Sequence, residues 1–203
     1  MAITINGSTG ITSSEIADSA ITSTKIADGT ITNADINSSA AIAGTKVDGS
    51  FGKVLQVVQD TYTGHTSVAS SSYQNILSVT IAPSSASNKV KIEFLINLGM
   101  TGGDEGAHIR IYRGATALLL GDARGSRDRA FTHCGSHYAA NEQYGASGIY
   151  LDSPATTSAQ TYYIAVRGHS SGYPIHINSG ESDADGHQYS ATASVIIVTE
   201  IAG

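Results

Sequence analysis

The sequence has one cysteine, no tryptophan and only 14% charged residues in 203 positions. The single cysteine, Cys134, excludes an internal disulfide framework and any metal cage built from several thiolates. So few charges argue against a charge-rich helical bundle and against the strongly charged class of disordered chain. Glycine is abundant instead, with 22 residues, and together with the many serines and threonines it favours turns and β-structure.

Positive charge is also scarce, because 11 Lys and Arg residues against 17 Asp and Glu residues give a formal net charge of −6. A nucleic-acid backbone attracts basic surfaces, so nucleic acid is not expected as a partner. No apolar run approaches the roughly 20 residues that span a bilayer. Met1 is followed by Ala-Ile-Thr-Ile rather than by a basic segment and a long apolar stretch. We therefore expect a chain made without a secretion signal and without membrane insertion.

The first fifty residues are repetitive. Aliphatic residues recur every five positions, with one inserted alanine before the last two: Ile11, Ile16, Ile21, Ile26, Ile31, Ile36, Ile42 and Val47. Five residues advance an α-helix by about 500°, so these side chains would not form one stripe. On a strand they would alternate between the two faces. A short extended piece followed by a bend fits the spacing, and Asp28 and Gly29 are typical of such a bend.

The repeat buries too little apolar surface to compensate for the conformational entropy that a single chain would lose on folding. Burying an isoleucine contributes about 1.5–3 kcal/mol, whereas ordering five backbone units costs on the order of 5–10 kcal/mol. Three copies wound around a common axis would bring three isoleucines together in each layer. We therefore predict an intertwined homotrimeric β stalk with the eight aliphatic residues as its core. A flexible tether and a single-chain β-solenoid are the alternatives.

The five-residue repeat does not continue into residues 51–203, which are predicted to form a separate domain. Residues 1–50 are predicted to form an attachment segment and the stalk. Segment 88–100 alternates, with every second residue from Val90 to Met100 apolar, as in a half-buried antiparallel strand. Further strands are expected at 53–59, 73–83, 108–113, 115–120, 148–151, 161–167, 173–177 and 189–201. Many short strands between Gly, Ser, Asn and Asp turns predict an all-β fold, an antiparallel β-sandwich of the jelly-roll type.

The longest stretch without a clear period covers residues 121–146. Long loops in compact domains are often functional. Guanidinium groups pair with carboxylate or phosphate and tyrosine rings stack, so this loop suits an anionic or sugar surface. The candidate receptor contacts are Arg124, Arg127, Arg129, His137, Tyr138 and Tyr144. The alternative is that the arginines pair with Asp122, Asp128 and neighbouring acids across a subunit interface.

Motifs that carry catalysis or hold metals are mostly missing from the sequence. His133 and His137 are four residues apart, a spacing that places two metal ligands on one face of a helix. The segment around them has no helical pattern, and the zinc motif HExxH does not occur in the sequence. Residues 181–186 resemble the start of a calcium loop, yet Thr192 stands where a bidentate glutamate is required. Neither a G-x-S-x-G elbow nor a phosphate-cradling glycine motif occurs. We expect no catalytic residue, no metal and no cofactor, and hence a protein that is not an enzyme.

Several segments resemble a domain that is common in structural proteins of tailed bacteriophages, notably phages of marine bacteria and cyanobacteria. They are GKVLQVVQDTYTG (52–64), HIRIYRGATALLLGDARGSR (108–127), YLDSPATTSAQTYYIAVRG (150–168) and VIIVTEIAG (195–203). The pattern ITSSEIADSAITSTKIADGTIT is similar to repeats that precede such domains in tail-fibre-like proteins. Together these segments and the repeat span nearly the whole chain.

The resemblance implies a trimeric virion appendage assembled in the host cytoplasm: a tail fibre, a head fibre or a capsid decoration. Residues 1–10 would attach it to other virion proteins, and the knob would act as an adhesin for host-surface glycan. The chain shows no recognisable tail-anchoring domain before the repeats, which favours a head fibre or decoration over a full-length tail fibre. Two alternatives are a cement protein that stabilises the particle without host binding, and a carbohydrate-binding or hydrolysing module.

Overall fold

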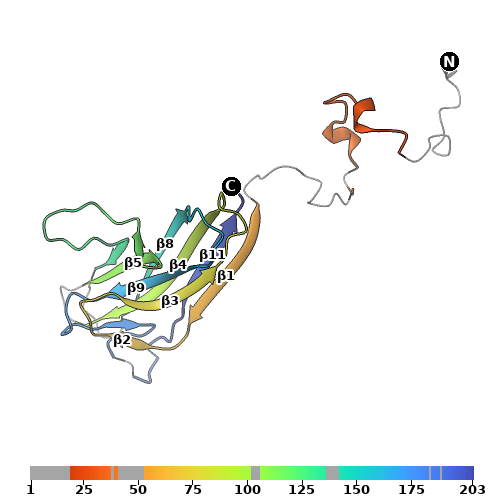
Figure 1. The fold of residues 1–203 in the computed structure, drawn as a ribbon. Coiled ribbons are helices and arrows are strands. Elements are labelled where there is room, and N and C mark those ends of the chain that lie inside the picture. The colour runs from red at the N-terminus through yellow and green to blue at the C-terminus, as the bar shows by residue number, and fades with distance from the viewer. Residues whose placement is uncertain are drawn as a thin grey trace, which may run out of the picture. The chain divides into compact units, whose positions relative to one another are not determined.

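The computed structural model describes residues 19–37, 39–40, 53–101, 106–135, 142–182, 184–187 and 189–203 (Figure 1). The chain divides into two compact units, Met1–Gly49 and Ser50–Gly203. The two units differ in their secondary structure. The first contains two single turns of 3-10 helix, and the second consists of β-strands.

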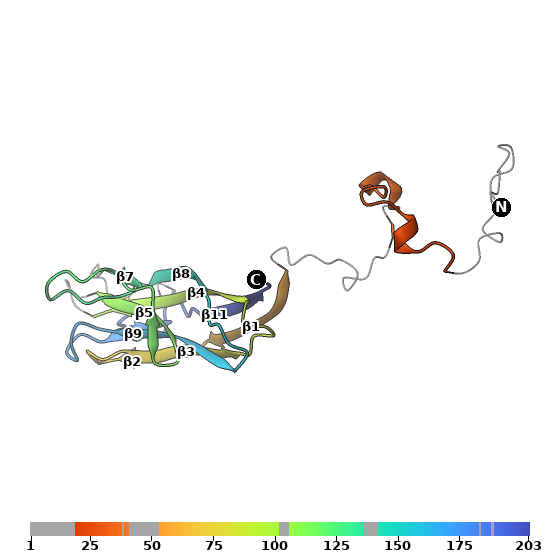
Figure 2. The same cartoon turned by 45° about the horizontal axis from the view of Figure 1, so that its top comes forward.

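Two antiparallel sheets form the second unit. Sheet A contains β1 (Val54–Tyr62), β2 (Thr66–Val68), β4 (Lys89–Met100), β8 (Tyr144–Asp152), β10 (Ile175–Ile177) and β11 (Ser194–Ile201). Sheet B contains β3 (Gln74–Ile81), β5 (Ala107–Arg113), β6 (Thr116–Leu118), β7 (Thr132–Cys134) and β9 (Gln160–Arg167). Figure 2 shows β8, β4 and β11 in one layer and β9 and β3 in the other. The predicted all-β fold with antiparallel sheets is confirmed.

The order of the strands mixes early and late parts of the chain. In sheet A the order is β1-β11-β4-β10-β2, and β8 also pairs with β4; in sheet B it is β3-β9-β5-β6, and β7 also pairs with β5. The first strand of the unit therefore lies beside the last one, with Val57 opposite Thr199. Long-range pairing of this kind holds both ends of the unit in one sheet.

The alternation of β4 supplies much of the core. Its inward residues Val90, Ile92, Phe94, Ile96, Leu98 and Met100 are all buried, with at most 4% of each exposed. From sheet B, Leu77, Ile111 and Ile164 pack against them in one apolar cluster. Because successive side chains of a strand point to opposite faces, the other residues of β4 lie on the outside of the sandwich.

Some strand boundaries differ from the prediction. The last strand begins at Ser194 rather than at 189, and β10 begins at Ile175 rather than at 173. Two three-residue strands, β2 and β7, were not expected, since three residues are too few to show an alternation. β7 and the start of β8 both fall within the stretch 121–146 that was predicted to be a loop.

The buried carboxylate of Glu200 joins three parts of the sandwich. Gln56 Nε2 donates to Oε2 over 2.5 Å, and Asn88 Nδ2 donates to Oε1 over 2.5 Å. The Ser84 backbone N–H and hydroxyl also donate to Oε1, over 2.6 and 2.8 Å. These bonds connect β11 to β1 and to the turn between β3 and β4. They compensate for placing a carboxylate at a position with no solvent exposure.

The repeat unit follows the predicted bend but adds a helical turn. A turn occurs at Asp28 and Gly29, where Gly29 has a φ of +77°. The 3-10 turns, Ser23–Lys25 and Asn33–Asp35, were not expected from the spacing. In the second of them the Thr32 N–H and hydroxyl both donate to the Asp35 carboxylate over 2.8 Å. Such local side-chain bonds compete with an extended backbone.

The repeat isoleucines that are described lie on the surface of the single chain. Ile21, Ile26, Ile31 and Ile36 are 57, 38, 54 and 40% exposed. Ile11, Ile16, Ile42 and Val47 lie outside the described residues. In the described ranges, no helix is both long enough and apolar enough to cross a membrane.

Candidate functional site

The outer face of sheet B carries arginine, histidine and tyrosine side chains. Ile109 and Ile111 of β5 are fully buried, so the alternating residues His108, Arg110 and Tyr112 point away from the core. The pairing of β5 with β9 places Arg167, Ala165 and Tyr163 opposite these three. The next strand, β3, follows Tyr73. This face thus combines cationic and aromatic groups on rigid strands.

Asp128 is the acidic centre of this face. It belongs to the arginine loop, which we define as residues 119–131 between β6 and β7. Tyr73 donates its hydroxyl to Asp128 Oδ2 over 2.5 Å, and Arg110 Nη2 donates to Oδ1 over 3.0 Å. Arg167 Nε lies 2.9 Å from Oδ2 as an ion pair, and His108 Nδ1 lies 3.5 Å from the same oxygen. One carboxylate thus connects the loop to β5, to β9 and to the residue before β3.

Hydrogen bonds to backbone carbonyls hold the arginine loop together and attach it to β5. Arg110 Nε donates to the carbonyl of Arg129 over 2.7 Å, and Arg129 Nε donates to the carbonyl of Gly121 over 2.6 Å. The Gly121 N–H donates to the Ala130 carbonyl over 3.3 Å. At the end of the loop the Phe131 N–H bonds to Ile109 of β5. The loop is therefore attached at both ends to sheet B, and its tip is left to solvent.

Stacked rings and guanidinium groups cover the strands beside the loop. The Arg110 guanidinium lies 4.1 Å from the centroid of the Tyr73 ring, and that of Arg167 lies 5.6 Å from it. The rings of Tyr112 and Tyr163 stack at 4.9 Å with an interplanar angle of 8°. Cation–π contacts and stacked rings hold these side chains in fixed orientations. The result is a preorganised aromatic and cationic surface.

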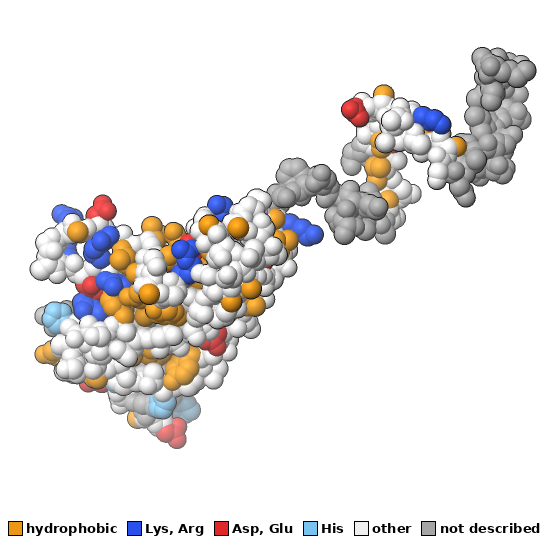
Figure 3. Space-filling model, in the orientation of Figure 1, with side chains coloured by type: hydrophobic (Ala, Val, Ile, Leu, Met, Phe, Trp, Pro, Cys, Tyr) orange, Lys and Arg blue, Asp and Glu red, His pale blue; other side chains and the backbone are white. Residues whose placement is uncertain are grey.

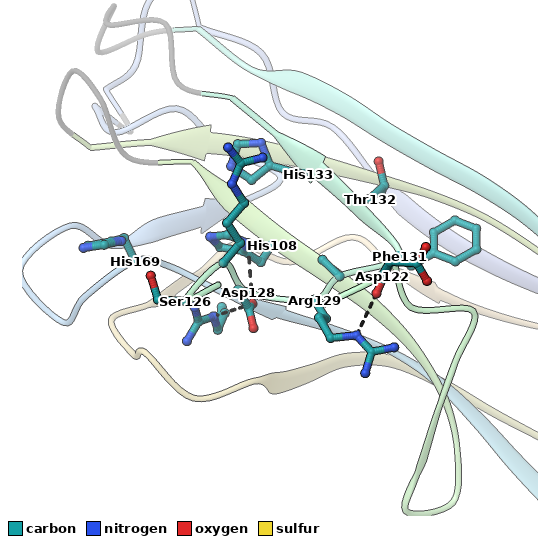
Figure 4. Close-up of a pocket in the computed structure, with 13 residues that line it drawn as sticks. His108, Asp122, Ser126, Asp128, Arg129, Phe131, Thr132, His133 and His169 are labelled. Atoms are coloured by element: carbon teal, nitrogen blue, oxygen red, sulfur yellow. Dashed lines mark hydrogen bonds and ion pairs between the residues drawn. The ribbon is translucent and has the colours of Figure 1, made fainter. Parts of the chain in front are cut away.

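A groove of about 740 Å³ lies between the arginine loop and the ends of β5, β7 and β9. The basic side chains that line it are His108, Arg127, Arg129, His133, Arg167 and His169. Its acidic lining residues are Asp122 and Asp128. Figure 4 shows Asp128 directed at His108 within this groove. In Figure 3, Lys and Arg side chains gather around the loop at this end of the sandwich.

The environment of the groove sets the charge of two of its groups. Burial disfavours the ionised form of Asp128, but the hydrogen bond from Tyr73 and the charges of Arg167 and Arg110 outweigh it and lower the pKa. Burial and the neighbouring His133 lower the pKa of His108, although Asp128 opposes them. At neutral pH Asp128 is therefore an anion and His108 is uncharged. The rings of His108 and His133 lie 4.9 Å apart.

The candidate contacts from the sequence are only partly brought together. Arg124, Arg127 and Arg129 are exposed on the arginine loop, and the last two line the groove. Tyr144 begins β8 in the other sheet, where its hydroxyl bonds to the Glu142 carboxylate. His137 and Tyr138 lie outside the described residues.

Asp128 is paired within its own chain, whereas pairing of the loop arginines with acids of a second subunit stays a prediction. Asp128 is occupied within its own chain, by Arg110 and Arg167 of the strands rather than by arginines of the loop. In the described part of the chain, the Arg124 and Arg127 guanidinium groups have neither an ion pair nor a side-chain hydrogen bond. Both therefore remain available to a ligand.

Sequence reasoning did not include Tyr73, Arg110, Tyr112, Tyr163 and Arg167 in the site. A signal for two of them was present, because the alternation of 108–113 puts Arg110 and Tyr112 on the face opposite to the buried isoleucines. That β9 lies close to the arginine loop follows from the pairing of strands that are distant in the chain, and no local sequence pattern predicts it.

Metal coordination has little support in this structure. Among the residues that are described, no group of three or more His, Cys, Asp and Glu side chains is placed so that it could hold a metal ion. Asp183 of the calcium-like turn lies outside these residues. With the fold and groove defined, the chain was compared with known proteins: no family model matches it, and no curated protein matches it.

Proposed function

We propose that this chain is a non-enzymatic structural protein of a tailed-phage virion, a trimeric fibre or knob that contacts the host surface. The observation that carries the host contact is the groove beside the arginine loop. On a protein with a formal net charge of −6, this groove gathers three arginines and three histidines around two acids. A local excess of basic groups on an acidic protein attracts an anionic partner.

The chemistry of the groove favours an anionic glycan. Exposed guanidinium groups such as that of Arg127 form bidentate bonds with carboxylate, sulfate or phosphate. On the same face of sheet B, but outside the lining of the groove, the stacked pair Tyr112 and Tyr163 offers a flat aromatic surface of the kind on which sugar rings pack. Asp122 adds an exposed acceptor for sugar hydroxyl groups. A single contact of this type is weak, and many copies on one particle would give avidity.

The state of Asp128 supports binding rather than hydrolysis. A glycosidase needs one carboxylic acid with a raised pKa and a second carboxylate on the other side of the sugar bond. The pKa of Asp128 is lowered, and its oxygens already accept from Tyr73 and Arg110. It serves to hold the loop in place. This is the reason for preferring a binding module over a hydrolysing one.

The finer architecture that we propose is a jelly-roll knob on a trimeric stalk. Jelly-roll sandwiches interleave early and late strands in both sheets, and the orders β1-β11-β4 and β3-β9-β5 follow that rule. For the stalk, the support is the exposure of the four described repeat isoleucines in the single chain. Apolar side chains at regular spacing gain burial when sister chains cover them.

Binding to host cells tests the proposed host contact. The variant Arg124→Ala/Arg127→Ala removes two exposed guanidinium groups without removing a bond that holds the loop. We expect the purified full chain to lose at least about tenfold in affinity for host cells, with a weaker dependence on salt. Lys53→Ala is the matched control, because Lys53 is an exposed cation outside the groove. Equal affinity of the two variants would contradict the role of the loop.

The location on the particle is tested separately. An antibody against the chain should decorate intact virions in electron micrographs, and unlabelled particles would contradict the virion assignment. Particles that lack the chain should adsorb poorly. If they adsorb normally but break on heating, the decoration function replaces the host contact.

A further inference from the structure

The two outer faces of the sandwich differ in chemistry. Of the exposed large apolar side chains in the described part of the second unit, all but Leu119 and Tyr173 lie on strands of sheet A. They are Val54, Leu55, Val57, Leu95, Ile149 and Leu151. The outward residues of β5 and β9 in sheet B include no isoleucine, leucine or valine. They are His108, Arg110, Tyr112, Thr161, Tyr163, Ala165 and Arg167.

Strand pairing gathers the apolar residues of sheet A into one patch. We define the apolar face by six residues that the register places on the same side of four adjacent strands. They are Val57 of β1, Val195 and Ile197 of β11, Leu95 of β4, and Ile149 and Leu151 of β8. Ile149 is 67% exposed and Leu151 is 52% exposed. Between β4, β8 and β11 the face is hollowed into a groove of about 270 Å³.

The charges on this face are balanced. Lys91 and Glu93 stand between the apolar rows on β4 and form an ion pair at 2.8 Å. They are the only charged residues in the rows that contain the six apolar side chains. A face with no net charge does not repel an identical face, and it does not attract the anionic headgroups of a membrane. In an assembly, Lys91 and Glu93 can exchange partners between copies.

The chain order connects this face to the repeat. β1, the strand that directly follows the repeat in the sequence, is an edge strand of sheet A. The repeat and sheet A, which follow one another along the chain, therefore both expose aliphatic side chains in the single chain. The exposed isoleucines of the repeat and the apolar face would both gain burial if they were covered by further copies of this chain.

We propose that the apolar face of sheet A is a second homomeric contact, covered by the other two copies of this chain. The inference rests on the proposed homotrimer and specifies which surface of the knob lies inside it. The arginine loop and its groove belong to the opposite sheet and stay outside. Ile149, the most exposed member, would insert into the hollow between β4, β8 and β11 of a neighbouring copy.

The first test compares the masses of full-length variants by sedimentation equilibrium over a range of concentrations. Ile149→Asp/Leu151→Asp places two charges on the face, at side chains that contribute little to the core. We expect the concentration at which the trimer dissociates to rise at least tenfold. Leu119→Asp is the matched control, because Leu119 is 58% exposed and lies outside the face. An unchanged dissociation curve for the double variant would overturn the inference.

The second test does not depend on a disruptive variant. In a Cys134→Ser background, Ser147→Cys places a thiol beside Leu95 on β4, and Ser78→Cys places one on the outer face of sheet B. Above the dissociation concentration, we expect a maleimide to react at least tenfold more slowly with position 147 than with position 78. Below it, the two rates should converge. Equal rates at both concentrations would overturn the inference.

The outcomes separate this inference from the proposed function. A wild-type chain that stays monomeric would overturn both the homotrimer and the covered face. A wild-type trimer whose two engineered thiols react equally would overturn the covered face alone. Unchanged host binding in the loop variants would overturn the host contact alone and leave the covered face to its own two tests.

Discussion

The Tyr73 hydroxyl donates a 2.5 Å hydrogen bond to the carboxylate of Asp128, which lies 55 residues further along the chain. The contact joins the residue before β3 to the arginine loop. Because Arg110 and Arg167 surround the same carboxylate, the bond belongs to a network that fixes the wall of the candidate groove. The shape of the site therefore depends on one acidic side chain.

Replacing this acid should release the loop. Asp128→Asn removes the charge that Arg110 and Arg167 share and weakens the bond from Tyr73. We expect backbone amides of residues 121–131 to exchange hydrogen at least about tenfold faster, because the loop opens more often. Mass spectrometry of the exchanged peptides measures this change. Asp122→Asn is the control, since Asp122 is exposed, and equal exchange in the two variants would contradict the role of Asp128.

Glu200 should make the stability of the fold depend on acidic pH. Burial works against its charged form, but four donated hydrogen bonds lower its pKa from 4.5 to about 2. A carboxyl whose pKa is depressed in the folded state stabilises the fold fully above its unfolded pKa, and this stabilisation is lost as the pH falls through the folded pKa. We therefore expect the free energy of unfolding to decrease between about pH 4.5 and pH 2.

The variant Glu200→Gln isolates this contribution. Its amide cannot accept all four bonds, so we expect a loss of about 2 kcal/mol at neutral pH. The decrease below pH 4.5 should become smaller than in the wild type. Urea titrations at fixed protein concentration measure both effects. Asp185→Asn, at an exposed position, should behave like the wild type, and a Gln variant with the full wild-type pH dependence would contradict the assignment.

Gly148 should not tolerate a methyl group. A Cβ at this position would lie 2.3 Å from an atom of the Phe131 ring and 2.6 Å from one of the Phe94 ring. These rings pack edge to face at 5.9 Å, and Phe131 ends the arginine loop. We expect Gly148→Ala to cost about 1–3 kcal/mol in thermal or urea unfolding. Gly135→Ala has no atom within 4 Å of its Cβ and serves as the control; equal stabilities would contradict the packing.

The single thiol should react slowly. Burial raises the pKa of Cys134, and the thiolate is the reactive form. We expect its reaction with a maleimide at pH 8 to be at least about tenfold slower than that of a free thiol, and to accelerate as the pH is raised. Unfolding in guanidinium should remove the difference. A rate equal to that of free cysteine in the folded protein would show that the side chain is not shielded.

Long periodic segments were predictable, whereas short and irregular ones were not. The six alternating apolar residues from Val90 to Met100 predicted β4, since one buried face is enough to fix the phase of a strand. β8 was predicted over only 148–151, because its outward residues Ile149 and Leu151 are more apolar than the inward Gly148. A strand that is apolar on its outer face does not show the usual alternation, and the same exposed residues, Ile149 and Leu151, belong to the face for which we propose a homomeric contact.

The position of the candidate groove in the sequence was predictable, but the full set of residues that form and support it was not. The arginine-rich, aperiodic stretch indicated the loop, and Arg127 and Arg129 do line the groove. The residues that hold the loop, Tyr73, Arg110 and Arg167, lie on three separate segments of the chain. No local pattern relates them to Asp128.

The amino-acid sequence by itself determined the all-β class, the inward face of β4 and the five-residue repeat, because these follow from the spacing of apolar side chains along the backbone. Only the tertiary structure decided that Asp128 meets Tyr73, Arg110 and Arg167, and that sheet A is the sheet with an apolar outer face. Both results depend on which strands pair and in what register. Pairing is a relation between segments far apart in the chain, and it is fixed by packing of the whole core.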